Sequence, residues 1–272
     1  MIKTGNAMKM ETVTSVKTIE MQYGTGEEPV LVVCSDRNRY VCKYMRSSAS
    51  AFKLACELSG AMLAKEWELP SPQAAFVKIK HEHWTPACPL NLSAPMFGSR
   101  KMDSVIDVTR TTSSEIPCTE KLQRQIMKIA LFDIWTANED RNWNNANLLY
   151  DVMDEDLIVI DHGCIFNTAT FDYPVCQLTT TDSILASDLA RALLTPLTDK
   201  SMQDMTEQLR EDFDACTGRC EKNAESIAGL MPDGWHVKPE TVVNKLGQLA
   251  EPAWKEGCWD NFMEYLNDNR NG

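Results

Sequence analysis

The chain has 272 residues, 43% of them hydrophobic, which is enough for a buried core in two lobes or one large domain. It carries 27 basic and 39 acidic residues, and this net charge of −12 argues against direct nucleic-acid binding. No apolar run approaches the roughly 20 residues that span a bilayer, and the amino terminus lacks a signal-peptide core. We therefore expect a cytoplasmic protein with no membrane contact, whose ten cysteines are free thiols.

The amino-terminal part of the chain predicts a small antiparallel β-sheet. The apolar run at residues 30–34 and the alternating segment at residues 39–44 are typical of strands, and turn residues precede each of them. In the first turn, Gly24, Thr25 and Gly26 form a segment whose backbone could close over phosphate groups. An ordinary hairpin turn explains the same glycines, so this feature is a weak signal by itself.

Two charged residues in this part invite a functional interpretation. Lys43 lies in the second strand, where it either extends to solvent or contacts phosphates as a kinase small-lobe lysine does. A helix predicted over residues 50–67 carries Glu57 beside its apolar face. Glu57 is either a solvated surface residue or an ion-pair partner that positions Lys43. Residues 84–95 contain three prolines and are expected to form the connection between two lobes. In kinases, adenine stacks against a connection of this kind.

A polar loop at residues 138–147 follows a predicted helix and precedes two short apolar runs. In this loop Asp140 is followed five positions later by Asn145, and the second apolar run ends at Asp161. A carboxylate at the end of a buried strand is costly unless a cation compensates it. Divalent cations such as Mg²⁺ prefer carboxylate and amide oxygens. Asp140, Asn145 and Asp161 could therefore bind such a cation together, and the order Asp, Asn, Asp is the layout of a phosphotransferase site.

In that layout each residue has a distinct role. Asp140 would orient and deprotonate an acceptor hydroxyl, while Asn145 and Asp161 would hold Mg²⁺ against the phosphates of ATP. The alternative is that Asn and Asp are common in loops because their side chains satisfy turn backbone groups. That alternative explains single residues better than it explains the whole ordered set.

The same stretch resembles the catalytic segment of HipA-like kinases of the HipA_2 type, in a short, single-chain branch of that family. The residues that carry the resemblance are Asp133, Trp135, Asn138, Asp140, Arg141, Asn145, Asn147, Leu148, Leu149, Ile160-Asp161-His162-Gly163 and Phe166. The glycine-containing turn and the strand that holds Lys43 resemble the small lobe of the same branch. The resemblance implies an α+β, bilobal protein-kinase-like fold. Residues 1–95 would form the ATP-binding lobe, and residues 96–272 the mainly helical lobe with loop 138–147 and Asp161-His162-Gly163.

The resemblance also implies an activity, which is ATP- and Mg²⁺-dependent phosphorylation of a serine or threonine of a protein substrate. Autophosphorylation, a toxin-like role and an antitoxin-type regulator are further implications. Catalysis would involve Asp140, Lys43 and Glu57; ATP would contact Gly24, Thr25, Gly26, Lys43 and Arg141; the metal would be bound by Asn145 and Asp161.

One departure from the family pattern concerns charge. Familiar members have His two residues after the catalytic Asp and Lys before the Asn, whereas this chain has Asn142 and Asn144. Arg141 or Lys43 is expected to supply the missing cation. Three other interpretations stay open, namely a small-molecule kinase, a phosphatidylinositol-type lipid kinase, and a nucleotide-binding pseudokinase that acts through a partner.

Overall fold

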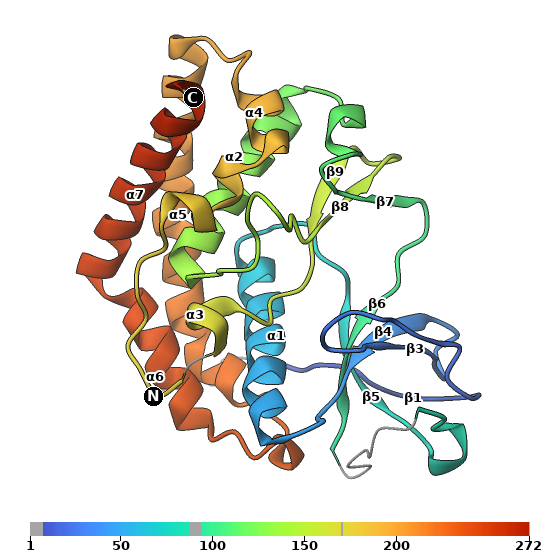
Figure 1. Cartoon of the computed structure of the whole chain (residues 1–272). Helices are drawn as coiled ribbons and strands as arrows, with labels where there is room; N and C mark the ends of the chain where they lie inside the picture. Colours follow the sequence, from blue (N-terminus) through green and yellow to red (C-terminus); the bar gives the residue numbers. More distant parts are fainter. Residues whose placement is uncertain (1–7, 87–93, 170, 272) are drawn as a thin grey trace.

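A six-stranded sheet and one long helix form the amino-terminal lobe of the computed structural model, which describes residues 8–86, 94–169 and 171–271 (Figure 1). The strand order is β1-β5-β6-β4-β3-β2. The bounds are Thr12–Thr14 (β1), Met21–Gln22 (β2), Val30–Val33 (β3), Arg39–Lys43 (β4), Ala74–Lys78 (β5) and Met96–Arg100 (β6). Strand β1 pairs with β5 in parallel, whereas the other described ladders of this sheet are antiparallel as expected.

Strand β6 corrects the expected boundary between the lobes. Gly98 pairs with Cys42 of β4 on one side and with Ala75 of β5 on the other, so the sheet continues to Arg100 and does not end at residue 95. Residues 84–95, of which 87–93 lie outside the described residues, therefore join two strands of one sheet. The chain crosses between the lobes after β6 instead. Gly98 is required here, because a Cβ on it would lie 2.6 Å from Val77 Cγ2.

Helix α1 (Ser48–Glu66) lies between the sheet and the helical lobe (Figure 1). Its carboxyl end is fixed to the helical lobe, because Arg219 donates two hydrogen bonds of 2.9 and 2.6 Å to the Glu66 carbonyl. The next residue, Trp67, is fully buried and packs against Phe132, Trp135 and Phe213. The helix that carries Glu57 is therefore packed into the main core, which also includes Phe97 of β6.

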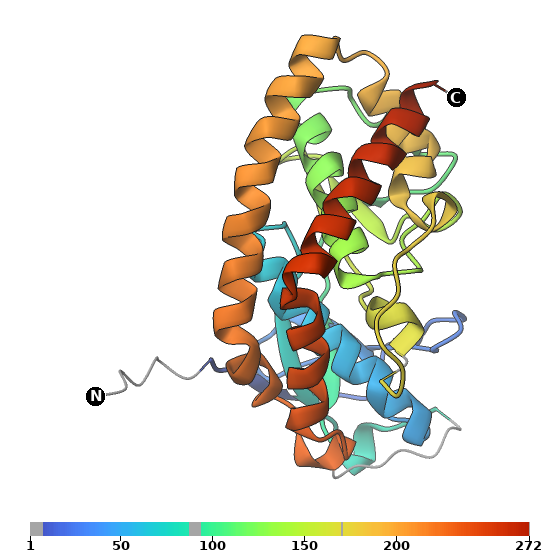
Figure 2. The ribbon, with the colours of Figure 1, turned by 90° about the vertical axis from the view of Figure 1, so that its left-hand side faces the viewer.

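The larger lobe is mainly helical, as expected. Its helices are α2 (Glu120–Thr136), α3 (Ile165–Ala169), α4 (Asp188–Leu194), α5 (Asp199–Ala228), α6 (Pro239–Ala250) and α7 (Pro252–Asn271). Figure 2 shows α5 along one side of this lobe, with α7 crossing over α2, against which it packs. No helix in the described part of the chain is long and apolar enough to cross a membrane.

A small sheet of β7 (Val105–Asp107), β8 (Leu148–Asp151) and β9 (Asp156–Val159) positions the polar loop. Helix α2 ends at Thr136, and its capping residue, Ala137, adopts a left-handed conformation with φ 51°. The loop then runs from α2 to β8, and Ile160 after β9 donates a hydrogen bond of 3.1 Å to the Asn147 carbonyl. This bond holds the end of the loop beside the segment that carries Asp161.

Candidate active site

The charged centre of the site joins three elements of the fold. Lys43, at the end of β4, places its Nζ 2.5 Å from Glu57 Oε1 of α1 and 2.7 Å from Asp161 Oδ1 after β9. The second oxygen of Glu57, Oε2, accepts a hydrogen bond of 3.0 Å from the backbone amide of His162. The ion pair expected between Lys43 and Glu57 is thus present, and it extends to Asp161.

Burial and charge set the protonation of these three groups. Burial raises the pKa of Glu57 to about 7, a shift that the Lys43 charge opposes and the Asp161 charge increases. Burial also acts to raise the pKa of Asp161, but the Lys43 charge and hydrogen bonds outweigh it and hold that pKa well below its usual value. For Lys43, the two carboxylates outweigh the lowering effect of burial and raise its pKa. Lys43 is therefore a cation and Asp161 an anion at neutral pH.

The polar loop is held in shape by its own side chains. Asn142 donates its backbone amide to the Asn145 carbonyl at 2.8 Å, and its Oδ1 accepts from the Asn145 amide at 3.2 Å. Asp140 Oδ2 accepts a hydrogen bond of 2.9 Å from Asn147 Nδ2. Sequence reasoning did not assign a role to Asn147, although its place two residues after Asn145 in the same loop was a usable signal. These bonds leave Asp140 and Asn145 lining a cavity between the two lobes, which also contains Lys43, Glu57 and Asp161.

Arg141 does not line the cavity, contrary to expectation. It is fully buried, forms an ion pair with Asp133 of α2, and donates to the carbonyls of Ile160 at 2.8 Å and Asn147 at 3.3 Å. Burial raises the pKa of Asp133 to about 6, against the opposing effects of Arg141 and Asn138. Arg141 therefore braces the loop from behind, and its guanidinium, bonded to Asp133, Ile160 and Asn147, lies outside the lining of the cleft where it was expected to contact ATP.

The inner part of the cleft is a polar chamber of about 430 Å³. It brings together residues from the glycine-containing turn, β4, α1, the polar loop and the segment after β9. Those that sequence analysis selected are Thr25, Gly26, Lys43, Glu57, Asp140, Asn145 and Asp161. Gly24 is exposed and lies outside this lining. The chamber has the size and polarity to hold a triphosphate.

The outer part of the cleft is a second chamber of about 430 Å³, whose walls combine apolar side chains with charged ones such as Arg100 and Asp107. Lys43, Asn147 and Asp161 line both chambers, so the two are continuous. The apolar part of the lining includes Val41, Phe97, Met102, Val105, Leu149 and Ile160. Such walls suit a flat ring such as adenine. The residues after β6 therefore line the edge against which a base would lie, and none of the described residues between 84 and 95 lines this chamber.

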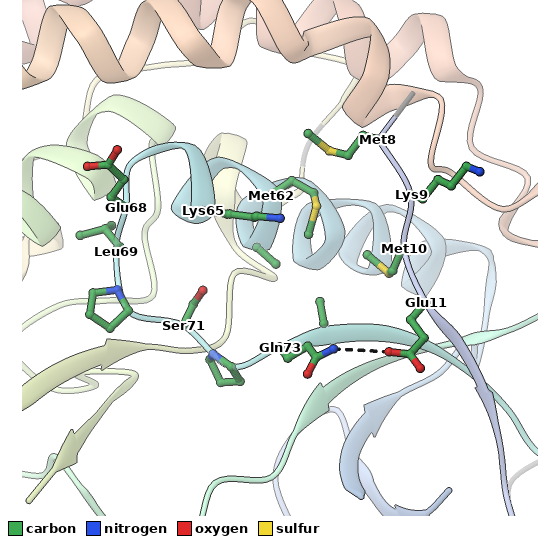
Figure 3. A pocket seen from close by; sticks show the side chains of 14 residues that line it. Met8, Lys9, Met10, Glu11, Met62, Lys65, Glu68, Leu69, Ser71 and Gln73 are labelled. Carbon is green, nitrogen blue, oxygen red and sulfur yellow. Dashed lines mark hydrogen bonds between the residues drawn. The ribbon is translucent and has the colours of Figure 1, made fainter. Parts of the chain in front are cut away.

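A larger cavity of about 630 Å³ lies elsewhere in the structure (Figure 3). It is lined by residues 8–11, the last turns of α1, and residues 68–74. Figure 3 shows methionine, lysine and glutamate side chains around it, with Gln73 bonded to Glu11 at 3.4 Å. None of the Asp and Asn residues of the polar loop lines it. Size alone therefore does not mark the functional site, whereas the chemistry of the lining does.

The donor set of the inner chamber fits a hard divalent cation. Asp161 offers a carboxylate and Asn145 an amide oxygen, which are the ligand types that Mg²⁺ prefers. Among residues 8–86, 94–169 and 171–271, no group of three His, Cys, Asp or Glu side chains could hold a metal without further ligands. A carboxylate and an amide oxygen from the protein suit an ion that is shared with phosphate oxygens, as Mg²⁺ commonly is in kinases.

Comparison with known proteins identifies the family. A family model described as HipA-like kinase matches residues 16–253. The chain belongs to the HipA-like kinase family. The crystal structure of a Helicobacter pylori proinflammatory kinase, CtkA, aligns with a TM-score of 0.55 at 12% sequence identity, covering 94% of this chain and 99% of that chain. No curated protein sequence matches significantly.

These comparisons confirm three predictions made from the sequence, which concern the family, the enzyme class and the fold. The HipA-like family was the one expected, and this HipA-like protein is a kinase. The alignment with CtkA shows that the two chains share the bilobal α+β fold over nearly their whole lengths.

Proposed function

We propose that this HipA-like kinase transfers the γ-phosphate of ATP, with Mg²⁺, to a serine or threonine hydroxyl of a protein. One observation carries the proposal: Asp140, Asn145 and Asp161 line the same chamber as the Lys43–Glu57 ion pair. Each is a group that phosphoryl transfer uses, and the reaction depends mainly on positioning and charge neutralisation.

Different residues of the cleft have different roles in the proposed reaction. The apolar outer chamber holds the base, and Lys43, oriented by Glu57, contacts the phosphates. Thr25 and Gly26 cover the triphosphate from the small lobe. Asn145 and Asp161 would hold Mg²⁺, which neutralises negative charge on the phosphate oxygens.

Asp140 receives the proton of the acceptor hydroxyl. The acceptor oxygen then forms a bond to the γ-phosphorus, the bond from that phosphorus to the β,γ-bridging oxygen breaks, and ADP leaves. Asn147 supports this step, because its amide donates to one Asp140 oxygen and fixes the direction of the carboxylate.

The surface beside Asp140 supports a protein acceptor. Trp143, three residues further along the loop, is 46% exposed, and the guanidinium of Arg110 lies 5.7 Å from its ring centre. An exposed aromatic residue in the same loop as Asp140 suits contact with another protein surface. The net charge of −12 disfavours an anionic membrane as the source of the acceptor. Family membership supports extending the proposal to a toxin-like role in the cytoplasm, autophosphorylation and an antitoxin-type regulator.

The test is phosphate transfer from γ-labelled ATP with Mg²⁺ to the chain itself and to a pool of cellular proteins. We expect label on serine or threonine with the wild type. Asp140→Asn should lose transfer but still bind ATP, and Asp161→Asn should lose Mg²⁺-dependent ATP binding. Asp154→Asn, at an exposed position of the β8–β9 hairpin, is the matched control. Label on a small molecule or lipid would refute the protein acceptor, and nucleotide binding without transfer would indicate a pseudokinase.

A further inference from the structure

A second lysine of the inner chamber comes from helix α1. Lys53 precedes Glu57 by four residues, which places both side chains on the same face of the helix. It lines the chamber together with Lys43, Asp140 and Asn145. Its side chain is 38% exposed, so the ammonium group lies at the mouth of the chamber and can move.

The charges of the lining show which cation is available to a ligand. Its carboxylates are those of Glu27, Glu57, Asp140 and Asp161, and its ammonium groups are those of Lys43 and Lys53. Lys43 is shared between two buried carboxylates. Lys53 has a single carboxylate partner in this lining, Glu27, at 2.5 Å. Of the two lysines, Lys53 is the one whose ion pair can be broken with little loss of free energy.

The polar loop offers the γ-phosphate no cation. Arg141 is buried against Asp133 on the far side of the loop. Asn142 is neutral and bonded within the loop, where its Nδ2 donates to the Glu139 carbonyl at 2.9 Å. Asn144 is neutral and exposed. Positive charge for the end of a triphosphate must therefore come from another element.

The pair between Lys53 and Glu27 is one that a phosphate can displace. Both side chains are more than one-third exposed, and ion pairs of that kind contribute little to stability. A phosphate group carries more negative charge than a carboxylate and offers three acceptor oxygens. The hydrogen bond that Lys53 donates to Glu27 raises the pKa of Lys53, although partial burial opposes this, so the side chain stays charged when ATP arrives.

We propose that Lys53 leaves Glu27 and binds the terminal phosphate of ATP, supplying from helix α1 the positive charge that the polar loop lacks. This role rests on the proposed function, since it assumes that ATP occupies the cleft. It makes Lys53 a specificity residue for triphosphate over diphosphate. ADP has no γ-phosphate, so Lys53 remains with Glu27 when ADP is bound.

The exchange also has a consequence for the glycine-containing turn. Glu27 belongs to that turn, and its pair with Lys53 ties the turn to α1. A second pair, between Glu28 and Arg46 at 2.9 Å, ties the turn to the segment between β4 and α1. When Lys53 binds ATP, its ion pair with Glu27 breaks while the pair between Glu28 and Arg46 remains. The turn can then move over the phosphates while it is still held to the segment before α1.

The experiment is titration of Mg²⁺-ATP and Mg²⁺-ADP into the full chain by calorimetry. Lys53→Met should weaken ATP binding about tenfold or more and leave ADP binding within about twofold, because one charge-assisted contact to the γ-phosphate is lost. Lys53→Arg should retain the preference for ATP. Glu27→Gln, which frees Lys53, should bind ATP as tightly as the wild type or more tightly.

Two controls separate this role from a structural one. Lys65→Met changes an exposed lysine of the same helix that lines the other cavity (Figure 3) and should alter neither affinity. If Lys53 only anchors the turn through Glu27, then Lys53→Met and Glu27→Gln will weaken both nucleotides alike, and the inference is overturned. Equal ATP affinity in the wild type and Lys53→Met also overturns it while the kinase proposal stands. A wild-type chain that binds neither nucleotide overturns both.

Discussion

Gly60 of helix α1 lies directly against His162, the residue after Asp161. A Cβ on Gly60 would come within 2.3 Å of the His162 Cβ. The imidazole is buried, which lowers its pKa, and the Arg141 charge lowers it further, so the ring is neutral. It packs edge-on against Phe132, with ring centres 6.0 Å apart. The contact between Gly60 and His162 sets the distance between the helix that carries Glu57 and the segment that carries Asp161.

Gly60→Ala should disturb the site through that contact. An alanine inside a helix normally stabilises it by about 1 kcal/mol relative to glycine, but overpacking costs about 1–3 kcal/mol. Because the clash involves the rigid base of His162, we expect the free energy of unfolding to fall by about 1–2 kcal/mol and ATP affinity to fall with it. Urea denaturation measures the first effect, and nucleotide titration the second.

The matched control for this change is Gly218→Ala in α5, where nothing lies within 4 Å of an added Cβ. It should raise stability by up to about 1 kcal/mol and leave ATP binding unchanged. A Gly60→Ala protein that gains stability as Gly218→Ala does would show that α1 is not packed tightly against His162.

The raised pKa of Glu57, about 7, predicts a pH dependence of activity. Protonated Glu57 leaves Lys43 paired with Asp161, whereas ionised Glu57 draws Lys43 away and leaves Asp161 freer to bind a cation. We therefore expect kcat/KM for ATP to rise as pH increases through about 7, since this constant reports the free enzyme. Glu57→Gln should be slower and lack this rise. A Glu57→Gln profile that keeps the rise would assign the titration to another group.

The raised pKa of Glu57 predicts that stability falls over the pH range in which activity rises. The folded pKa of Glu57 lies above its ordinary value of 4.5, so the folded state holds this proton more tightly than the unfolded state. The contribution of Glu57 to stability is therefore greatest below pH 4.5 and declines as pH rises to about 7. Stability and activity should change in opposite directions over this interval, and the difference in unfolding free energy between wild type and Glu57→Gln measures the contribution.

Arg141→Met tests the structural role of this arginine. Removing one partner of a buried ion pair leaves the Asp133 charge uncompensated, at a cost of about 3–5 kcal/mol. The double variant Arg141→Met, Asp133→Asn should recover part of that loss. If Arg141 instead contacted ATP, the single variant would lose nucleotide affinity with little change in unfolding free energy, and the double variant would recover nothing.

Sequence reasoning predicted correctly which side chains lie together where those residues are close in the sequence. Asp140, Asn145 and Asp161 lie in a loop and at a strand end that a single hairpin separates, so the sequence predicts that they line one chamber. The direction of Arg141 was not predictable in this way, because a loop has no periodicity that decides which side chains point inward. Its partner, Asp133, lies on the preceding helix, and only the folded structure shows how completely the pair is buried.

Strand β6 and Lys53 show two other limits. The β6 sequence contains a glycine and two polar residues, so its strand character depends on pairing with β4 and β5, which are distant in sequence. Helical periodicity places Lys53 on the face of Glu57. The opposing Glu27, however, comes from a turn 26 residues earlier, and its approach depends on how the sheet packs against α1.

Leu149 allows a test of where the base of the nucleotide lies. In β8, Leu148 and Tyr150 are buried in the lobe, whereas Leu149 points to the opposite face and lines the apolar outer chamber. Leu149→Trp should fill the space for adenine and weaken ATP and ADP equally, by about tenfold or more, because lost ring contacts of about 1.5–3 kcal/mol do not depend on the number of phosphates. Competition with a fluorescent nucleotide measures both affinities.

Leu149→Met provides the volume-matched control and should change either affinity by no more than about twofold. The equal loss for ATP and ADP distinguishes this variant from Lys53→Met, which should affect ATP alone. Unaltered nucleotide binding by a folded Leu149→Trp protein would place adenine outside the outer chamber. It would also remove the reason for assigning the residues after β6 to the edge that faces the base.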